Sequence, residues 1–335
     1  MKVERKEISE DDFAKAIKIT GGLCNALSKV IRGRSDTIEL VITALISDGH
    51  VLLEDYPGSG KTTLCKTLGR LIATDSSSEK HILPFRRIQF TPDMLPGDVL
   101  GVNVFDPKTG NFNFMHGPVF AHIVLADEIN RTGPKVQAAF LECMAEKQVT
   151  IDNVTYPLDD LFFVLGTQNP LDLAGTYPLP LVQLDRFLLK LPMSYVSSDV
   201  EEEILESHRE IVEIGTTCEP VCEREDILFV RSVAQEVYIS ENLRKAIVEI
   251  VQATRTSSLL EFGASTRAAL MLQSALRGYA ILKGRDYATE DDLKYMLPYV
   301  LLHRLRFHRG AGEPHDALME LAAPALEKLA SSVKR

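Results

Sequence analysis

Apolar and polar positions divide the chain into a strand-rich central part and helical parts on either side. Between about residues 50 and 191, short apolar runs alternate with helical stretches, which is typical of βαβ units around a parallel sheet. The runs lie at residues 51–53, 87–90, 122–126, 161–165 and 187–189. This pattern predicts an α/β fold with a doubly wound, five-stranded parallel sheet.

Two further segments predict β-hairpins that project from this sheet. In the first, apolar residues at 102–104 and 112–114 face each other across a turn-forming segment at 106–110. In the second, two short apolar strands flank the turn at residues 152–153. A pair of movable arms and plain surface decoration both fit this pattern, and the sequence alone favours surface decoration.

Helical periodicity marks the residues that precede the sheet. Ser9 and Asp12 resemble a helix cap, and apolar residues follow at roughly helical spacing as far as Val30. The pair Gly21-Gly22 is expected to interrupt this helix, because glycine weakens helices.

The strands are expected to stop after Pro192, where a helical domain begins. Ser198 and Glu201 form a capping-box pattern, so the acidic run beside them is interpreted as a solvated first helical turn. Apolar residues then recur at helical spacing at residues 243–254, 272–279 and 293–301. The predicted units are an N-terminal helical segment (1–24), an α/β core that carries both hairpins (25–195) and an α-helical domain (196–335).

The composition is that of an ordinary globular protein. The 335 residues are 45% hydrophobic and 25% charged, which permits a large core. The 37 Lys and Arg against 47 Asp and Glu give a net charge of −10, opposite in sign to a general nucleic-acid binder. A charged N-terminus, apolar stretches that all fall short of ~18 residues and five cysteines favour a cytoplasmic protein that is not inserted in a membrane.

The strongest chemical motif is DYPGSGKT at residues 55–62, between a predicted strand and a predicted helix. Its glycines allow backbone N–H groups to surround phosphate oxygens, Lys61 neutralises phosphate charge, and the Thr62 hydroxyl is a ligand for Mg²⁺. This is a Walker A phosphate loop, although Asp55 stands where the full pattern has glycine. The expected nucleotide-binding residues here are Gly58, Ser59, Gly60, Lys61, Thr62 and Thr63.

A carboxylate pair follows the third predicted strand. The apolar run at residues 122–126 leads into Asp127-Glu128, 66 residues after Lys61. A parallel strand directly beside the phosphate-loop strand would bring Asp127 to Mg²⁺ and place Glu128 to polarise an attacking water. Two carboxylates at a strand end also commonly cap a turn, and it is the Walker A motif that favours a Walker B pair here.

Further motifs resemble the MoxR family of AAA+ ATPases. They are GPVF (117–120), IVLADEINR (123–131), GTQNP (166–170), LDRF (184–187) and GASTRAA (263–269). The resemblance covers roughly residues 25–310 and implies an AAA+ P-loop NTPase core with a C-terminal α-helical lid domain. It also implies ATP and Mg²⁺ as cofactors, a homo-oligomeric ring that is usually hexameric, and two hairpins that correspond to family insertions. Members of the family often act as chaperone-like maturation factors beside proteins with von Willebrand factor A domains.

The resemblance gives roles to three side chains outside the Walker motifs. Asn169 becomes sensor 1, which holds the lytic water, although Asn-Pro also commonly starts a turn. Arg186 becomes the arginine finger that reaches a neighbouring subunit's ATP, or else an ion-pair partner of Asp185. Arg267 becomes sensor 2, through which the lid would feel the γ-phosphate, with a salt bridge inside the lid as the alternative.

Position supports three more interpretations. Ser265 resembles an N-cap, so Arg267 would be a cation in a helix's first turn, where it opposes the macrodipole and calls for an anion. Arg131 is a second candidate for an intersubunit or sensing role, although a plain surface charge is favoured there. Residues 31–33 stand where AAA+ proteins usually hold adenine.

These motifs predict an ATP-driven machine that remodels or matures a protein client. One rival is a nucleotide-gated scaffold with little turnover, against which the presence of Glu128 argues. A second rival is a DNA-acting AAA+ motor, against which the acidic balance argues, so nucleic acid is not an expected partner.

Overall fold

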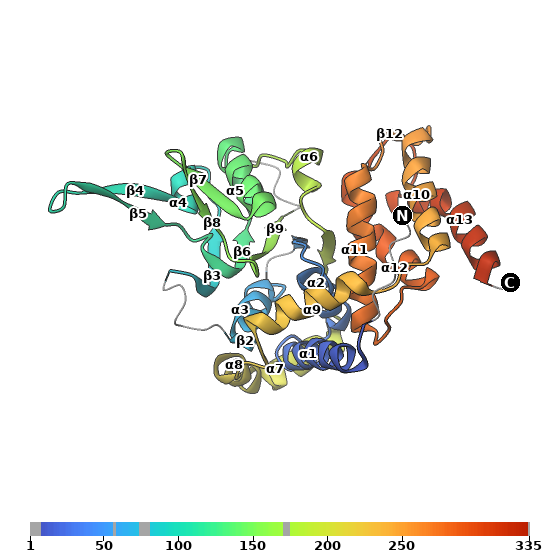
Figure 1. The fold of residues 1–335 in the computed structure, drawn as a ribbon, viewed down its shortest axis with the longest axis horizontal. Helices are drawn as coiled ribbons and strands as arrows, with labels where there is room; N and C mark the ends of the chain where they lie inside the picture. The colour runs from blue at the N-terminus through green and yellow to red at the C-terminus, as the bar shows by residue number, and fades with distance from the viewer. Residues whose placement is uncertain (1–7, 56–57, 74–80, 170–174, 334–335) are drawn as a thin grey trace.

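A five-stranded parallel sheet lies at the centre of the molecule (Figure 1). The computed structural model describes residues 8–55, 58–73, 81–169 and 175–333. The strand order across the sheet is β10-β1-β9-β6-β3. These strands are β1 (Val51–Asp55), β3 (Leu83–Gln89), β6 (Ala121–Asp127), β9 (Phe163–Gln168) and β10 (Leu189–Met193). The predicted α/β fold with five parallel strands is confirmed.

Both faces of this sheet are covered, as is usual for parallel sheets. In β1, Val51 and Leu53 belong to one hydrophobic cluster, whereas Leu52 points the other way and belongs to a second. In β6, Ile123 belongs to the first cluster and Val124 to the second. The sheet therefore separates two cores and leaves the carboxyl ends of its strands as the edge where a site can form.

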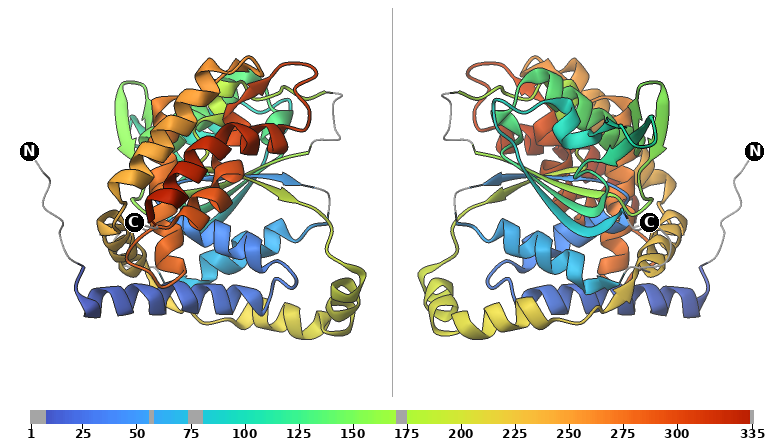
Figure 2. Two further views of the ribbon diagram at one scale, coloured as in Figure 1. Left: turned by 90° about the vertical axis from the view of Figure 1, so that its right-hand side faces the viewer. Right: turned by 90° about the vertical axis from the view of Figure 1, so that its left-hand side faces the viewer.

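Helices from both ends of the chain share the first core. In Figure 2, α1 lies beneath α2 and α3, which cover one face of the sheet. Buried residues of α9 to α13 belong to the same hydrophobic cluster as those of α1 to α3. These helices are α1 (Glu10–Ser28), α2 (Ser35–Ile46), α3 (Lys61–Leu71), α9 (Arg224–Glu236), α10 (Glu241–Thr256), α11 (Thr266–Leu282), α12 (Glu290–Leu301) and α13 (Pro314–Val333). Across the described ranges, no helix combines the length and the apolarity needed to cross a bilayer.

Helix α1 runs without a break through Gly21 and Gly22, so the expected interruption is wrong. Each glycine costs such a helix roughly 1 kcal/mol. Leu23 and Leu27 are fully buried on the inner side of α1, and their packing outweighs that cost. The expected cap is present, because Ser9 is the N-cap and accepts a hydrogen bond from the backbone of the first turn.

The second core is smaller and lies on the opposite face of the sheet. Its buried residues include Val99 from α4 and Phe140 from α5. The elements that contribute to this core are α4 (Pro96–Leu100), α5 (Pro134–Glu146), α6 (Leu181–Leu184) and the 3₁₀ turn η1 (Ile129–Arg131). Helix α5 begins shortly after η1, so part of this face of the sheet is covered by the segment that follows β6.

Short strands continue beyond Pro192, contrary to the expectation. β11 (Cys222–Glu223) pairs with β2 (Ile72–Ala73), and β12 (Leu260–Phe262) pairs with β13 (Arg306–Phe307). Each has only two or three residues, which is too few for a periodic pattern. Before them lie α7 (Ser198–Glu206) and α8 (His208–Thr217). Ser197 is the N-cap of α7, so this helix begins one residue earlier than the capping-box pattern placed it.

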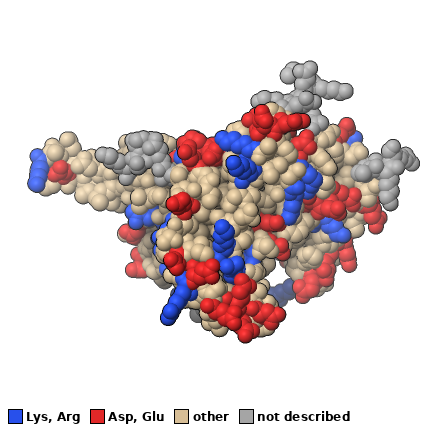
Figure 3. Space-filling view, turned by 90° about the horizontal axis from the view of Figure 1, so that it is seen from below, with Lys and Arg blue, Asp and Glu red and all other residues tan. Residues whose placement is uncertain are grey.

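Both predicted hairpins are present, and they contact each other. The longer one, β4 (Gly101–Asp106) with β5 (Asn111–His116), forms an arm that projects from the body; the shorter one is β7 (Gln148–Ile151) with β8 (Val154–Pro157) (Figure 1). The Phe114 ring stacks on the Tyr156 ring with centroids 3.9 Å apart, and Asn103 donates a 2.7 Å hydrogen bond to Asp152. Most of the arm's surface visible in Figure 3 is uncharged. The hairpins are therefore one connected unit.

Ion pairs fix the C-terminal helices to the edge where the sheet's strands begin. Arg231 of α9 is buried and lies 2.7 Å from Asp48, which precedes β1. Arg304, in the 3₁₀ turn η2 (Leu302–Arg304), is also buried and lies 2.8 Å from Asp185. Arg304 further donates to the carbonyl of Phe187, just before β10. Helix α9 and the turn η2 are thus anchored away from the carboxyl ends of the strands.

Candidate nucleotide-binding site

The predicted phosphate loop joins β1 to α3 at the carboxyl edge of the sheet. Helix α3 begins at Lys61, and its N-cap Gly60 has a φ of 90°. Gly58 has a φ of 84°. Left-handed backbone of this kind favours glycine and helps successive N–H groups to form an anion-binding nest. The positive end of the α3 dipole adds to that nest.

Asp55, the departure from the full Walker A pattern, is the last residue of β1. It pairs with Met193 of β10, so its backbone is extended and needs none of the conformational freedom of glycine. The next two residues, 56 and 57, lie outside the described residues. The left-handed turns that shape the described part of the loop are those of Gly58 and Gly60.

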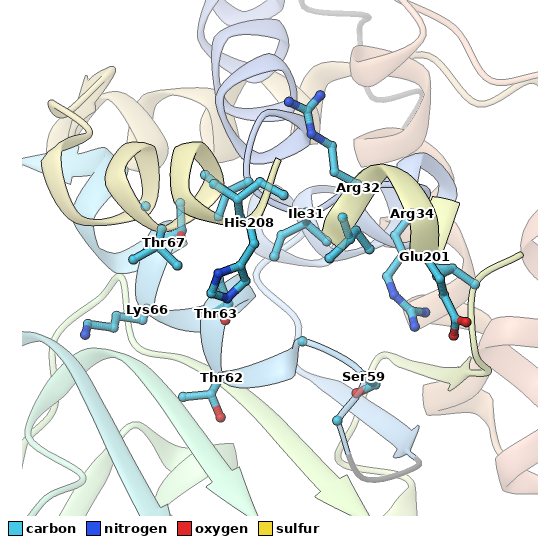
Figure 4. Close-up of a pocket in the computed structure, with 18 of the residues that line it drawn as sticks. Ile31, Arg32, Arg34, Ser59, Thr62, Thr63, Lys66, Thr67, Glu201 and His208 are labelled. Carbon is cyan, nitrogen blue, oxygen red and sulfur yellow. The ribbon is translucent and has the colours of Figure 1, made fainter. Parts of the chain in front are cut away.

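A cavity of about 740 Å³ opens beside this loop (Figure 4). One wall comes from the loop and α3 and includes Ser59, Thr62 and Thr63. The facing wall comes from α7, α8 and the segment at residues 30–34. Ile31 belongs to that segment, so the position expected for adenine borders the cavity. The volume is in the range of sites that bind nucleotide-sized molecules.

Asp127 is the buried anion of the site. It is the last residue of β6 and is 1% exposed. Its Oδ1 atom lies 3.1 Å from Lys61 Nζ and accepts a 2.8 Å hydrogen bond from the Thr167 hydroxyl. Its Oδ2 atom accepts hydrogen bonds of 2.5 and 3.1 Å from Arg87.

These contacts keep Asp127 ionised. Burial alone would raise the pKa of Asp127, but the hydrogen bonds from Arg87 and Thr167 and the charge of Lys61 bring it below its ordinary value. A carboxylate that binds Mg²⁺ must carry its charge at neutral pH, and this one does.

The strand that carries Asp127 is not beside the phosphate-loop strand, so that expectation is wrong. β9 lies between β1 and β6 and pairs with both. Lys61 nevertheless reaches Asp127, because its side chain extends across the carboxyl end of β9. The intervening strand supplies Thr167, which hydrogen-bonds to Asp127.

Glu128 follows in a left-handed conformation, with φ 57° and ψ 49°. Its backbone N–H donates a 2.8 Å hydrogen bond to the Thr167 hydroxyl, which stabilises this turn. Its carboxylate accepts a 2.7 Å hydrogen bond from Gln89 and lies 3.2 Å from Arg131 Nε. Arg131, expected as a plain surface charge, is therefore an ion-pair partner of Glu128. Left-handed non-glycine residues cost about 1 kcal/mol or more and gather at functional sites.

Asn169 lies at the same edge of the sheet. It is the first residue after β9, the strand between β1 and β6, and it is half-buried. The sheet therefore brings Asn169 to the strand ends that carry Lys61 and the pair Asp127-Glu128.

Arg186 lies at the opposite edge. It precedes β10, whose first residue Leu189 pairs with Val51, the first residue of β1, whereas the phosphate loop follows the last residue of β1. The five residues of β1 span about 16 Å between these two edges. The Arg186 guanidinium donates a 2.9 Å hydrogen bond to the Leu141 carbonyl.

The charge of Arg267 acts on Arg304, which binds residues at the edge where the strands begin. Arg267 is exposed in the first turn of α11, after the expected N-cap Ser265. Burial, with a smaller contribution from the charge of Arg267, lowers the pKa of Arg304 to about 10. Arg304 in turn binds Asp185, the neighbour of Arg186. Over the described part of the chain, the lining of the cavity includes neither Arg186 nor Arg267.

The groups at the carboxyl edge fit ATP with Mg²⁺. A Cβ atom on Gly58 or Gly60 would meet nothing within 4 Å, so the loop borders open space. Lys61 stands beside an ionised, buried carboxylate, which is the donor set that a magnesium-bound triphosphate requires. Thr62 and Asp127 would hold the metal, and the loop residues 58–63 would hold the phosphates.

Sheet, phosphate loop, carboxylate pair and helical domain together define a P-loop ATPase of the AAA+ class. The ATPase family associated with various cellular activities (AAA) matches residues 50–189, and the AAA lid domain matches residues 252–322. The expected C-terminal helical lid is thereby confirmed.

The similar proteins include a named chaperone. Chaperone MoxR1 of Mycobacterium tuberculosis is 36% identical over 90% of this chain and 77% of its own length. The uncharacterized protein YeaC of Bacillus subtilis (strain 168) is 44% identical over 87% of this chain and 88% of its own. A crystal structure of a candidate ATPase from Cytophaga hutchinsonii superposes with a TM-score of 0.83 at 36% identity, covering 95% of this chain and 96% of that one. The chain belongs to the MoxR family of AAA+ ATPases.

Three polar residues of the site were not predicted from the sequence. Arg87 and Gln89 lie on β3 and reach Asp127 and Glu128, and Thr167 lies on β9. The sequence does contain a pattern that could have indicated Arg87 and Gln89, because they are polar residues at alternate positions near the carboxyl end of a predicted strand.

Proposed function

We propose that this chain hydrolyses ATP with Mg²⁺ in a homo-oligomeric ring, hexameric as the family resemblance implies, and uses that reaction to remodel a protein client. The observation that carries the proposal is the 3.1 Å approach of Lys61 to the buried Asp127, directly before Glu128. The name of the related chaperone MoxR1 supports a protein as the object of the work.

The phosphate loop binds and orients the substrate in this proposal. Backbone N–H groups of residues 58–63 and the Lys61 ammonium hold the phosphate oxygens. Thr62 and Asp127 hold the metal, and Mg²⁺, when bound, neutralises charge on the phosphates. The cavity wall around Ile31 receives the base.

Glu128 and Asn169 act on the attacking water. Glu128 accepts a proton from this water. At the same time the water oxygen bonds to the γ-phosphorus, and the bond between that phosphorus and the ADP oxygen breaks. The Asn169 amide holds the water in line. The left-handed turn at Glu128 places its carboxylate next to Asp127 without burying it in the sheet, because its side chain remains partly exposed.

Arg186 and Arg267 complete the site of a neighbouring subunit. Arg186 lies at the edge of the sheet opposite to its own phosphate loop, and both arginines are absent from the described lining of the cavity. A guanidinium supplied in trans stabilises the charge that develops during phosphoryl transfer. In this proposal Arg267 therefore senses the γ-phosphate bound to the adjoining subunit, not the one bound to its own subunit.

Nucleotide turnover by Glu128→Gln tests the reaction. The amide keeps the shape of the side chain but cannot take a proton, so we expect near-native nucleotide binding with turnover reduced about a thousandfold. Glu142→Gln, an exposed substitution on α5, serves as the matched control and should hydrolyse ATP normally. Equal phosphate release by both variants would refute the assigned base, and negligible release by the unsubstituted chain would favour a nucleotide-gated scaffold.

The Glu128→Gln variant also tests the client. Because it holds ATP without consuming it, it should retain partners that bind the ATP state. We expect a protein client, with a von Willebrand factor A domain protein as the partner that the resemblance implies. Stimulation of ATP turnover by DNA, together with salt-sensitive DNA binding, would instead favour the DNA motor.

A further inference from the structure

Strand β3 places two polar side chains against the carboxylate pair. Arg87 and Gln89 are two residues apart, so they point to the same face of β3, and Gln89 is in register with Asp127 on the neighbouring β6. Arg87 donates to Asp127 Oδ2 through two nitrogens, at 2.5 and 3.1 Å. Its Nη2 atom also donates a 2.6 Å hydrogen bond to the Gln89 side-chain oxygen.

All the strong acceptor positions of Asp127 are used by the chain itself. Lys61 and Thr167 occupy Oδ1, and Arg87 occupies Oδ2. A carboxylate buried this deeply requires such partners, because an unpaired buried charge is costly. A metal ligand, however, must offer a free lone pair, and a guanidinium on the same oxygen excludes it.

Arg87 is the partner best able to leave. The Arg87 side chain is 47% exposed, against 18% for Lys61, so water can solvate its guanidinium after it swings away. Lys61 is the more buried of the two cations and follows directly after the phosphate loop, so it has no need to leave when phosphates bind. Thr167 stays in place, because it also fixes the backbone of Glu128.

We propose that Arg87 is a positioning residue that substitutes for magnesium: it holds Asp127 Oδ2 in the nucleotide-free chain and gives up that oxygen when Mg²⁺ and nucleotide bind. This inference rests on the proposed function. The exchange keeps a positive charge beside Asp127 in both states, so the carboxylate is never left buried and unpaired.

Gln89 connects Arg87 to Glu128, the second carboxylate of the pair. Its oxygen accepts from Arg87, and its nitrogen donates to the Glu128 carboxylate at 2.7 Å. Departure of Arg87 removes one of the two hydrogen bonds that orient the Gln89 amide. Metal binding at Asp127 would therefore change the hydrogen bonding of Gln89, which contacts Glu128.

The experiment titrates Mg²⁺ against binding of a fluorescent ADP analogue to the full chain, without reference to turnover. In Arg87→Gln the competitor for Oδ2 is gone, and we expect the half-saturating Mg²⁺ concentration to fall about fivefold. Arg86→Gln is the control: it removes the same charge one residue away, on the opposite face of β3, and should leave that concentration nearly unchanged. Arg87→Lys keeps the charge, and its half-saturating Mg²⁺ concentration should lie between those of Arg87→Gln and the unsubstituted chain.

Thermal unfolding supplies a second readout that folding defects alone would not reproduce. Arg87→Gln should lower the unfolding temperature of the nucleotide-free chain by about 2 °C and that of the Mg²⁺ and ADP complex by less. An unchanged or higher half-saturating Mg²⁺ concentration, or equal destabilisation of both forms, would overturn the inference. Failure of the unsubstituted chain to bind nucleotide at any Mg²⁺ concentration would instead overturn the proposed function.

Discussion

The hydroxyl of Thr167 donates a 2.8 Å hydrogen bond to the Oδ1 atom of Asp127. The Thr167 hydroxyl oxygen itself accepts a 2.8 Å hydrogen bond from the backbone N–H of Glu128. A hydroxyl has one proton and two lone pairs, so it satisfies both neighbours at once. One side chain from the intervening strand therefore fixes both the metal ligand and the turn that carries the proposed base.

Thr167→Val should damage turnover more than nucleotide binding. Valine has the same shape without the hydroxyl, so it leaves the Glu128 amide and one carboxylate oxygen of Asp127 short of a partner. We expect a loss of about 1–3 kcal/mol in the free energy of unfolding and a fall of about 10- to 100-fold in ATP turnover. Urea unfolding and phosphate release measure the two effects. Thr167→Ser keeps the hydroxyl and should retain most activity; native turnover in the valine variant would contradict the role.

His50 makes the stability of the fold depend on pH. Its Nδ1 atom accepts a 3.1 Å hydrogen bond from the Val164 N–H, which assigns the proton to Nε2, and Nε2 donates to the Met144 carbonyl at 3.0 Å. Burial lowers the pKa of His50 to about 4. The unfolded chain takes up this proton near pH 6.5, and the folded chain does not. Stability present above pH 6.5 is therefore lost as the pH falls toward 4, by about 3 kcal/mol in total.

Urea unfolding at pH 7, 6 and 5 measures this loss. In His50→Gln the free energy of unfolding should be lower at pH 7 and should change less between pH 7 and 5, because one titrating group is gone. The exposed His315 provides the matched control, and His315→Gln should keep the native pH dependence. Parallel pH profiles for His50→Gln and the unsubstituted chain would show that His50 does not carry the effect.

Local signals predicted much of the fold and both Walker motifs. The apolar runs of the sheet and the loop around Gly58 and Gly60 depend on residues that are close in sequence. The order of the strands depends on residues that are far apart in sequence. For that reason the sequence did not predict β9 between β1 and β6. Arg87 was missed for the same reason: its partner Asp127 is 40 residues away and meets it only through the pairing of β3 with β6.

The position of Arg267 likewise combines features that the local sequence pattern predicts with one that depends on long-range contacts. Its helix, its N-cap Ser265 and its exposed first-turn position follow from the local pattern and are found in the structure. Its absence from the lining of the cavity does not follow from that pattern, because the place of α11 is set by how the C-terminal helices dock. That docking depends on long-range pairs such as Arg304 with Asp185, which are 119 residues apart.

Mixed assemblies test whether Arg186 acts in trans. Arg186→Ala should bind nucleotide almost normally and hydrolyse little, and Lys61→Ala should bind poorly but still donate its own Arg186. We expect partial recovery of turnover when the two are mixed, measured as phosphate release per subunit. The double variant Lys61→Ala with Arg186→Ala cannot donate the guanidinium and should give no recovery. Equal activity in both mixtures would count against action across subunits.

Stacking of Phe114 on Tyr156 should couple the two hairpins energetically. In a double-mutant cycle with Phe114→Leu and Tyr156→Leu, we expect a coupling free energy of about 1 kcal/mol, measured by chemical unfolding. Phe112 provides the control, because it lies against Phe105 near the tip of the arm with centroids 5.3 Å apart. Phe112→Leu and Tyr156→Leu should be additive. Additivity in the first cycle would mean that the hairpins respond independently.

If Arg186 acts on a neighbouring subunit as proposed, its location opposite to its own phosphate loop makes the association of subunits directional. A contact of this kind joins unlike surfaces, so a linear row always ends in one copy whose pocket lacks a donor, and only a closed circle has no such end. Under the proposed arrangement a pair would have one competent pocket out of two. Hydrolysis per subunit would then rise with protein concentration and level off at closure, while scarce, unassembled copies would hold nucleotide without consuming it.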